Sequence, residues 1–139
     1  MTNIKNTTKI LALAIATLIS LNACHKTHAD SNDTAKPIIT MVEPMANDTL
    51  SLAVEPEIHV EFTVTDETGL HDVSVLLIKN NTDTLMNETP TVHDLKVFSF
   101  HEHVIPTGIA SLVPMKVVIK AADHGGNVET KTIDFFVEP

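Results

Sequence analysis

Residues 57–66 read "EIHVEFTVTD", and this stretch decides the fold class of the chain. Apolar and polar residues alternate along it, and a period of two is the pattern of a β-strand with one buried and one exposed face. The residues predicted to face inward are Ile58, Val60, Phe62 and Val64, and those predicted to face outward are His59, Glu61, Thr63 and Thr65. The core is therefore expected to be built from β-sheet.

Similar segments occur on both sides of this stretch, separated by turn residues. The predicted strands are 37–44, 57–66, 72–79, 84–88, 95–106, 114–123 and 128–139, and the predicted turns are 47–49, 66–69, 80–83 and 124–127. In the predicted strands 95–106 and 114–123 the inward residues are Phe98, Phe100, Val104, Met115, Val117, Ile119 and Ala121, and the outward residues are Ser99, His101, His103, Lys116 and Lys120. About seven short strands without a helical segment predict an all-β fold, an immunoglobulin-like β-sandwich.

The composition agrees with this fold class and limits the stabilising chemistry. The chain has no Trp and no Tyr, five Phe, and many Val, Ile and Thr, a composition that favours strands over helices. Antibody domains have a Cys, Trp, Cys signature and a tyrosine corner, and neither is present because the chain holds a single Cys, no Trp and no Tyr. The fold must therefore be held by its apolar core without an internal disulfide.

The first 23 residues have the three parts of a secretory signal peptide. Lys5 and Lys9 precede an apolar run, "ILALAIATLISL" at 10–21, which is shorter than the ~20 residues of a membrane-spanning helix. The following "LNAC" at 21–24 resembles the lipobox of bacterial lipoproteins, in which the signal is cut before an invariant cysteine that is then acylated. Cys24 fills that position. Ordinary cleavage that leaves a free thiol is the alternative.

These features predict three segments. Residues 1–23 are the lipoprotein signal peptide, 24–36 are the lipidated cysteine and a flexible polar tether, and 37–139 are one sandwich domain. Two or more acyl chains anchor a protein stably to a bilayer. The protein is therefore expected in the cell envelope, attached to the outer membrane through the lipid on Cys24 and facing either the periplasm or the medium.

The charge of the chain excludes one class of partner. The formal net charge is −9, and loss of Lys5 and Lys9 with the signal peptide leaves −11 on the mature chain. Affinity for nucleic acid depends on Lys and Arg that neutralise phosphates. Nucleic acid is therefore not expected as a partner.

Four quoted stretches carry a family resemblance: "DTAKPIITMVEP" (33–44), "IHVEFTVTDETGLHDVSVLLI" (58–78), "HEHVIPTGI" (101–109) and "KAADHGGNVE" (120–129). Together they resemble the bacterial lipoproteins grouped as domain of unknown function 4625. The resemblance implies a membrane-anchored, immunoglobulin-like domain and no known activity. Members often carry a histidine-rich loop after the third strand, but the corresponding residues 79–84 read "KNNTDT" here. A metal site in that loop is therefore not carried over.

The sequence "HEH" at 101–103 is a candidate metal site. Residues two apart on a strand share a face, so His101 and His103 project together. In an immunoglobulin-like sandwich the strand with His59 pairs with this one, which brings His59 close, with Glu61 nearby. Three histidines with an open fourth position suit zinc, and imidazole also suits copper or nickel. The alternative is a set of solvated surface histidines.

Acidic and amide side chains in the predicted turns form a candidate calcium site. The residues concerned are Asp66, Glu67, Asp72, Asp123 and Asn127, of which Asp66, Asp123 and Asn127 are the predicted ligands. Carboxylate and amide oxygens are calcium ligands, although the spacing matches no calcium-loop motif. The alternative is ordinary turn chemistry, for which Asp and Asn are common.

A short pattern, "DTA" at 33–35 and "DTL" at 48–50 and 83–85, occurs in the chain. It is similar to the Asp, Thr/Ser, apolar sequon of an O-glycosylation system of some Gram-negative bacteria. The acceptors would be Thr34, Thr49 and Thr84, all in predicted tether or turn positions. Ordinary turn chemistry explains the same pairs equally well.

Catalytic motifs are absent from the sequence. No serine lies in a GxSxG elbow, and no motif pairs two carboxylates as acid and base. An enzyme is therefore not expected, apart from the minor alternative of a metal-dependent hydrolase on the three histidines. The function expected is a non-catalytic binding or adhesion module for a protein or glycan partner. The alternative is an envelope protein that binds zinc or copper through His59, His101 and His103.

Overall fold

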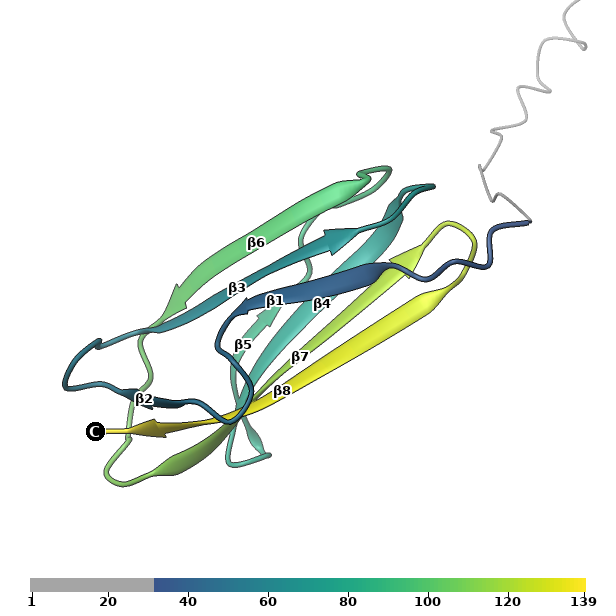
Figure 1. The fold of residues 1–139 in the computed structure, drawn as a ribbon. Helices are drawn as coiled ribbons and strands as arrows, with labels where there is room; N and C mark the ends of the chain where they lie inside the picture. The colour runs from purple at the N-terminus through teal and green to yellow at the C-terminus, as the bar shows by residue number, and fades with distance from the viewer. Residues whose placement is uncertain (1–31) are drawn as a thin grey trace, which may run out of the picture.

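The structure, a computed structural model, describes residues 32–139 as two β-sheets packed face to face (Figure 1). The strands are β1 (Ile38–Glu43), β2 (Thr49–Ser51), β3 (Ile58–Thr65), β4 (Leu70–Lys79), β5 (Asp83–Glu88), β6 (Val97–Val104), β7 (Val113–Asp123) and β8 (Val128–Glu138). This confirms the predicted all-β sandwich. The seven predicted strands are all present, with bounds that differ by at most two residues. The short strand β2 was not predicted.

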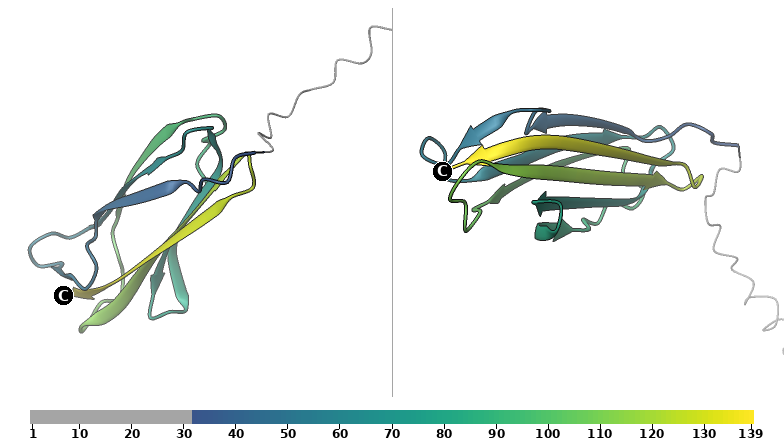
Figure 2. Two further views of the ribbon diagram at one scale, coloured as in Figure 1. Left: turned by 45° about the vertical axis from the view of Figure 1, so that its right-hand side comes forward. Right: turned by 90° about the horizontal axis from the view of Figure 1, so that it is seen from below.

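The two sheets differ in size and in the order of their strands. One sheet has the order β1-β3-β6, and the other has the order β2-β8-β7-β4-β5. Neighbouring strands are antiparallel except β2, which runs parallel to β8. This division is immunoglobulin-like. One sheet holds β1, β3 and β6, and the other holds the remaining long strands β4, β5, β7 and β8. Figure 2 shows how the chain passes from β1 in the small sheet to β2 in the large one.

The core lies between the sheets and uses the predicted inward faces. Ile58, Val60, Phe62 and Val64 of β3 are all 0% exposed, and the alternate residues of β3 are half-buried. Met115, Val117, Ile119 and Ala121 of β7 are buried against them. Fully burying an apolar side chain of this size contributes about 1.5–3 kcal/mol, so these residues supply much of the energy that stabilises the sandwich.

The aromatic residues of the small sheet extend this core toward β6. The rings of Phe62 and Phe100 stack with centroids 5.0 Å apart. Phe98 and Val104, both predicted to face inward, are only partly buried and pack at the margin of the core. These two side chains are only partly buried because β6 lies at the edge of the small sheet.

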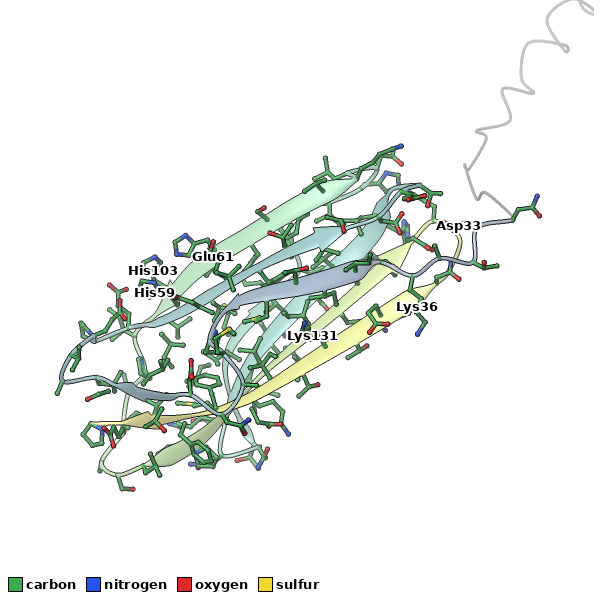
Figure 3. All side chains as sticks on the ribbon, viewed as in Figure 1. Asp33, Lys36, His59, Glu61, His103 and Lys131 are labelled. Atoms are coloured by element: carbon green, nitrogen blue, oxygen red, sulfur yellow. The ribbon has the colours of Figure 1, made fainter. Side chains whose placement is uncertain are left out.

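Residues 33–36, which the sequence places in the tether, lie against the sandwich. The Thr68 hydroxyl donates to Asp33 Oδ2 at 2.6 Å, and Asn127 Nδ2 donates to the Asp33 carbonyl oxygen at 3.1 Å. Lys36 Nζ lies 3.4 Å from Glu129 Oε2. Further along this side, Lys131 Nζ donates to the Ile39 carbonyl oxygen at 3.1 Å and so joins β8 to β1 across the two sheets (Figure 3). The chain therefore joins the domain several residues before β1 begins.

The predicted signal peptide, the predicted lipidation site Cys24, and the tether residues His25 and His28 lie outside the described residues. Within residues 32–139 no helix is long and apolar enough to cross a membrane.

Candidate metal centre

The pairing of β3 with β6 brings His59, His101 and His103 together. The register places His59 opposite His103 and Glu61 opposite His101. All three imidazoles lie on the outer face of the small sheet, because residues two apart on a strand share a face. Figure 3 shows His59, His103 and Glu61 grouped on these two strands. The predicted approach of His59 to the "HEH" sequence is therefore present in the fold.

The three rings are close enough to share one ion. The ring centroids of His59 and His103 are 4.0 Å apart, those of His101 and His103 are 4.7 Å apart, and those of His59 and His101 are 5.8 Å apart. Each residue offers a ring nitrogen, and these nitrogens lie within 4.8 Å of one another. Two ligands of a tetrahedral zinc at 2.0–2.1 Å are separated by about 3.4 Å. His101 and His103 are exposed, so small rotations of their side chains would bring the ring nitrogens from within 4.8 Å to the separation that zinc requires.

Three carboxylates surround the imidazoles. Glu55 Oε1 lies 3.2 Å from His59 Nε2, Glu43 Oε2 lies 3.7 Å from His59 Nδ1, and Glu57 Oε2 lies 3.3 Å from His103 Nδ1. A carboxylate that accepts the second ring N–H of a histidine fixes the orientation of the ring and raises its basicity as a ligand. Negative charge at this distance also favours a bound cation. Glu43 and Glu57 approach His59 and His103 only through the fold, whereas Glu55 lies four residues before His59 and no sequence pattern singled it out.

The predicted calcium ligands also meet, at the other end of β3. The carboxylates of Asp66 and Asp123 are buried, and each offers an oxygen within 4.8 Å of the other and of Asp33. Asp66 Oδ1 accepts the backbone N–H groups of Thr68 and Gly69 at 3.0 and 2.7 Å. These bonds are those of an Asx-type turn.

Asn127 lies at the same end of the sandwich and donates hydrogen bonds to Asp123. Its backbone N–H donates to Asp123 Oδ1, and its side-chain Nδ2 donates to Asp123 Oδ2, both at 2.8 Å. Asn127 therefore satisfies a buried carboxylate with its amide nitrogen. The hydrogen bonds of Asp66 and Asp123 correspond to the turn chemistry that was the alternative to calcium.

The pKa of Asp33 is held below its ordinary value. The hydrogen bond from the Thr68 hydroxyl is the largest cause, the backbone N–H of Ala35 adds to it, and desolvation opposes both. A hydrogen bond to the ionised form favours that form. The charge on Asp33 is thus stabilised by the contacts that hold the N-terminal segment on the domain.

The three candidate glycosylation threonines are exposed, but two of them do not lie in turns. Thr34 precedes β1, whereas Thr49 is the first residue of β2 and Thr84 the second residue of β5. The prediction of turn positions is wrong for these two. Asn47, Asn80 and Asn81 adopt positive φ angles of 67°, 54° and 61°, so the turns are completed before the threonines and the strands begin at once.

A second group of histidines was missed by the sequence analysis. His71, His93 and His124 each offer a ring nitrogen within 4.8 Å of the others. They come from the start of β4, the β5–β6 connection and the residue after β7. No spacing in the sequence relates them, because only the topology of the sandwich brings these three segments together.

No family model matches this chain, and no curated protein matches it either. Its function is therefore inferred from the side chains that the fold brings together.

Proposed function

We propose that this protein is a lipid-anchored metal-binding module of the bacterial cell envelope, which holds Zn²⁺ or Cu²⁺ at His59, His101 and His103. The observation that carries the proposal is the meeting of three imidazoles whose ligating nitrogens lie within 4.8 Å of one another. Three histidines with an open fourth position suit zinc, and copper also favours imidazole. The acidic surface of the chain, with a net charge of −9, would raise the local concentration of cations.

The role proposed is binding and not catalysis. The side chain of His103 is 43% exposed, and His101 is exposed on the same open sheet face. Metal-dependent hydrolysis gains from a site that excludes water and holds the substrate. An open face on a rigid β-ladder suits an ion that is stored, delivered or used to join a partner.

Calorimetric titration of the full chain with Zn²⁺ and with Cu²⁺ tests this proposal. The double substitution His101→Ala/His103→Ala should abolish binding at this site, since it leaves a single imidazole. The matched control is His25→Ala/His28→Ala, which removes the same number of imidazoles outside the cluster and should leave binding unchanged. Equal loss of affinity in both double variants, or no loss in either, would contradict the site.

A second candidate function, adhesion to a protein partner, is favoured by an exposed apolar row on the small sheet. Ile38 pairs with Thr65, which pairs with Val97, and the two apolar ends of this row are 65% and 60% exposed. A partner segment that adds to an unpaired strand edge can place its own apolar side chains against such residues. Ile38→Thr/Val97→Thr should then reduce recovery of a partner protein in a pull-down from native envelope, whereas His101→Ala/His103→Ala should not.

A further inference from the structure

The second histidine cluster, His71, His93 and His124, lies at the opposite end of β3 from the first. His59 is near the start of β3, and His71 follows the turn after its last residue, Thr65. Six residues of strand at ~3.3 Å each separate the two ends by roughly 20 Å. Figure 1 shows the β3–β4, β5–β6 and β7–β8 connections together at this end. The two clusters share no residue.

A β-bulge directs His71 toward this cluster. In the ladder between β4 and β7, Leu70 pairs with Asp123 and Asp72 pairs with Ala122, so that His71 is the extra residue without a partner. A bulge bends the strand and re-aims the side chain of the extra residue. The next residue after Asp123 is His124, and the ring centroids of His71 and His124 are 5.0 Å apart.

Backbone hydrogen bonds hold His93 beside the other two histidines. Asp94 N donates to the Leu70 carbonyl oxygen at 2.9 Å, and Leu70 N donates to the Leu95 carbonyl oxygen at 2.8 Å. Gly69 adopts a φ of 122°, which residues with a Cβ rarely adopt, so the backbone conformation just before Leu70 favours glycine. The ring centroid of His93 lies 4.5 Å from that of His124 and 5.5 Å from that of His71.

The carboxylate of Asp94 contacts two of these imidazoles. Its Oδ2 lies 3.1 Å from His93 Nδ1, and its Oδ1 lies 2.9 Å from His124 Nε2. A carboxylate that contacts a ligating imidazole fixes the orientation of its ring and raises its basicity as a ligand.

One nitrogen of this cluster lacks a satisfactory partner. His124 Nε2 is buried and lies 2.9 Å from Asp94 Oδ1, a contact that is an ion pair only when the imidazole is protonated; the neutral imidazole leaves this nitrogen without a hydrogen bond. Buried polar atoms in proteins are nearly always paired. An ion bound at this nitrogen would satisfy it, and a neutral imidazole is a common transition-metal ligand.

We propose that His71, His93 and His124, together with Asp94, form a second site for a divalent transition-metal ion. Zn²⁺ is the ion with which to test it. Three imidazoles that leave a fourth position open suit zinc, and the carboxylate of Asp94 beside two of them can hold their rings in place. The ion would join three connections, of which β3–β4 and β5–β6 are already linked to each other by backbone hydrogen bonds. The site stands independently of the proposed function, because its residues are distinct from His59, His101 and His103.

Zinc titration of the metal-free full chain in detergent, followed by calorimetry and by thermal unfolding, tests this site. We expect two ions per chain in the wild type and a single ion in His71→Ala/His93→Ala, both of which remove exposed side chains. His101→Ala/His103→Ala is the matched control and should lose the other ion. Zinc at a hundredfold excess over Kd should raise the Tm of that control by at least about 10 °C.

A second variant keeps the test independent of folding. Asp94 adopts a φ of 65°, which Asn tolerates as well as Asp does, so Asp94→Asn retains the turn. It should weaken zinc at this site by about 10- to 100-fold, as expected when a carboxylate partner of ligating histidines is lost. Unchanged zinc stoichiometry and affinity in both Asp94→Asn and His71→Ala/His93→Ala would overturn the proposal. One ion in the wild type that only His71→Ala/His93→Ala removes would support it and refute the site at His59.

Discussion

Thr68 is the residue that connects the N-terminal segment to the end of the sandwich. Its hydroxyl lies 2.6 Å from Asp33 Oδ2 and 2.9 Å from Asp66 Oδ1. A hydroxyl donates a single proton, so it serves one carboxylate at a time, and the shorter contact is that with Asp33. The charged state of Asp33 and the position of the segment that carries it are therefore linked.

Thr68→Val should raise the pKa of Asp33 toward the ordinary value of an aspartate, because the largest cause of its lowering is removed. Because the pKa of Asp33 is lower in the folded state than in the unfolded state, the contact stabilises the protein at pH values above the unfolded-state pKa. That stabilisation is lost as the pH falls through the folded-state pKa. The pKa is measured from the NMR shift of the Asp33 carboxyl carbon against pH. Thr132→Val, at an exposed position of β8, is the control and should leave that titration curve unchanged.

The turn hydrogen bonds of Asp66 and Asp123 lead to a prediction about calcium. Because these carboxylates already accept N–H groups from Gly69 and Asn127, we expect millimolar calcium to leave the Tm of the metal-free protein unchanged within about 1 °C. A site that bound calcium at a hundredfold excess over Kd would raise the Tm by at least about 10 °C. Thermal unfolding with and without calcium measures the difference, and such a rise would restore the calcium interpretation.

At the scale of single elements, β3 and β7 were predictable and β2 was not. Each of these strands buries one face, so its apolar and polar residues alternate. The alternation can be recognised from the residues of the strand alone. Strand β2 has three residues and pairs in parallel with β8, so it depends on a partner far away in the sequence. Leu70, the first residue of β4, is likewise added by its pairing with Asp123.

The same distinction separates the two histidine clusters. His101 and His103 share a strand face at a spacing of two, and β6 pairs with the strand of His59 in the expected topology. His71, His93 and His124 come from a bulge, a loop and a turn, none of which has a periodicity that the sequence displays. Glu43 and Glu55 were missed for the same reason, since they belong to the end of β1 and to the connection before β3.

Phe62→Ala should be the most damaging single truncation in β3. Phe62 is 0% exposed and its ring stacks on Phe100, and deletion of a buried phenyl ring costs about 3–5 kcal/mol. The free energy of unfolding is measured by urea denaturation. Phe136→Ala is the matched control, because Phe136 is 37% exposed, and it should cost well under half as much. Equal losses would mean that the core between the sheets does not carry the stability.

At the scale of the whole molecule, the described residues form a domain that we propose is attached at one end. The N-terminal segment joins the sandwich at Thr68 and Asn127, beside the turns that follow β3 and β7. The second histidine cluster is at this end and the first is at the other. If Cys24 carries lipid, the second histidine cluster therefore lies at the tethered end of the domain and the first at the far end.

The lipid itself is tested by metabolic labelling of the native host with a clickable fatty acid. The wild-type chain should be labelled and Cys24→Ala should lose the label, because Cys24 is the only thiol in the chain. His25→Ala is the control at the neighbouring residue and should retain it. A wild type without label, or label that persists in Cys24→Ala, would contradict the proposed anchor and the envelope localisation that depends on it.

The attachment of Asp33 to the sandwich also limits the working radius of the domain. Eight residues remain between Cys24 and Asp33, and a fully extended chain of that length spans at most about 30 Å. A lipid-anchored sandwich with so short a linker would stay in a thin layer next to the headgroups and would not reach across a wide compartment. Any protein that collects an ion from it must therefore come to the membrane surface.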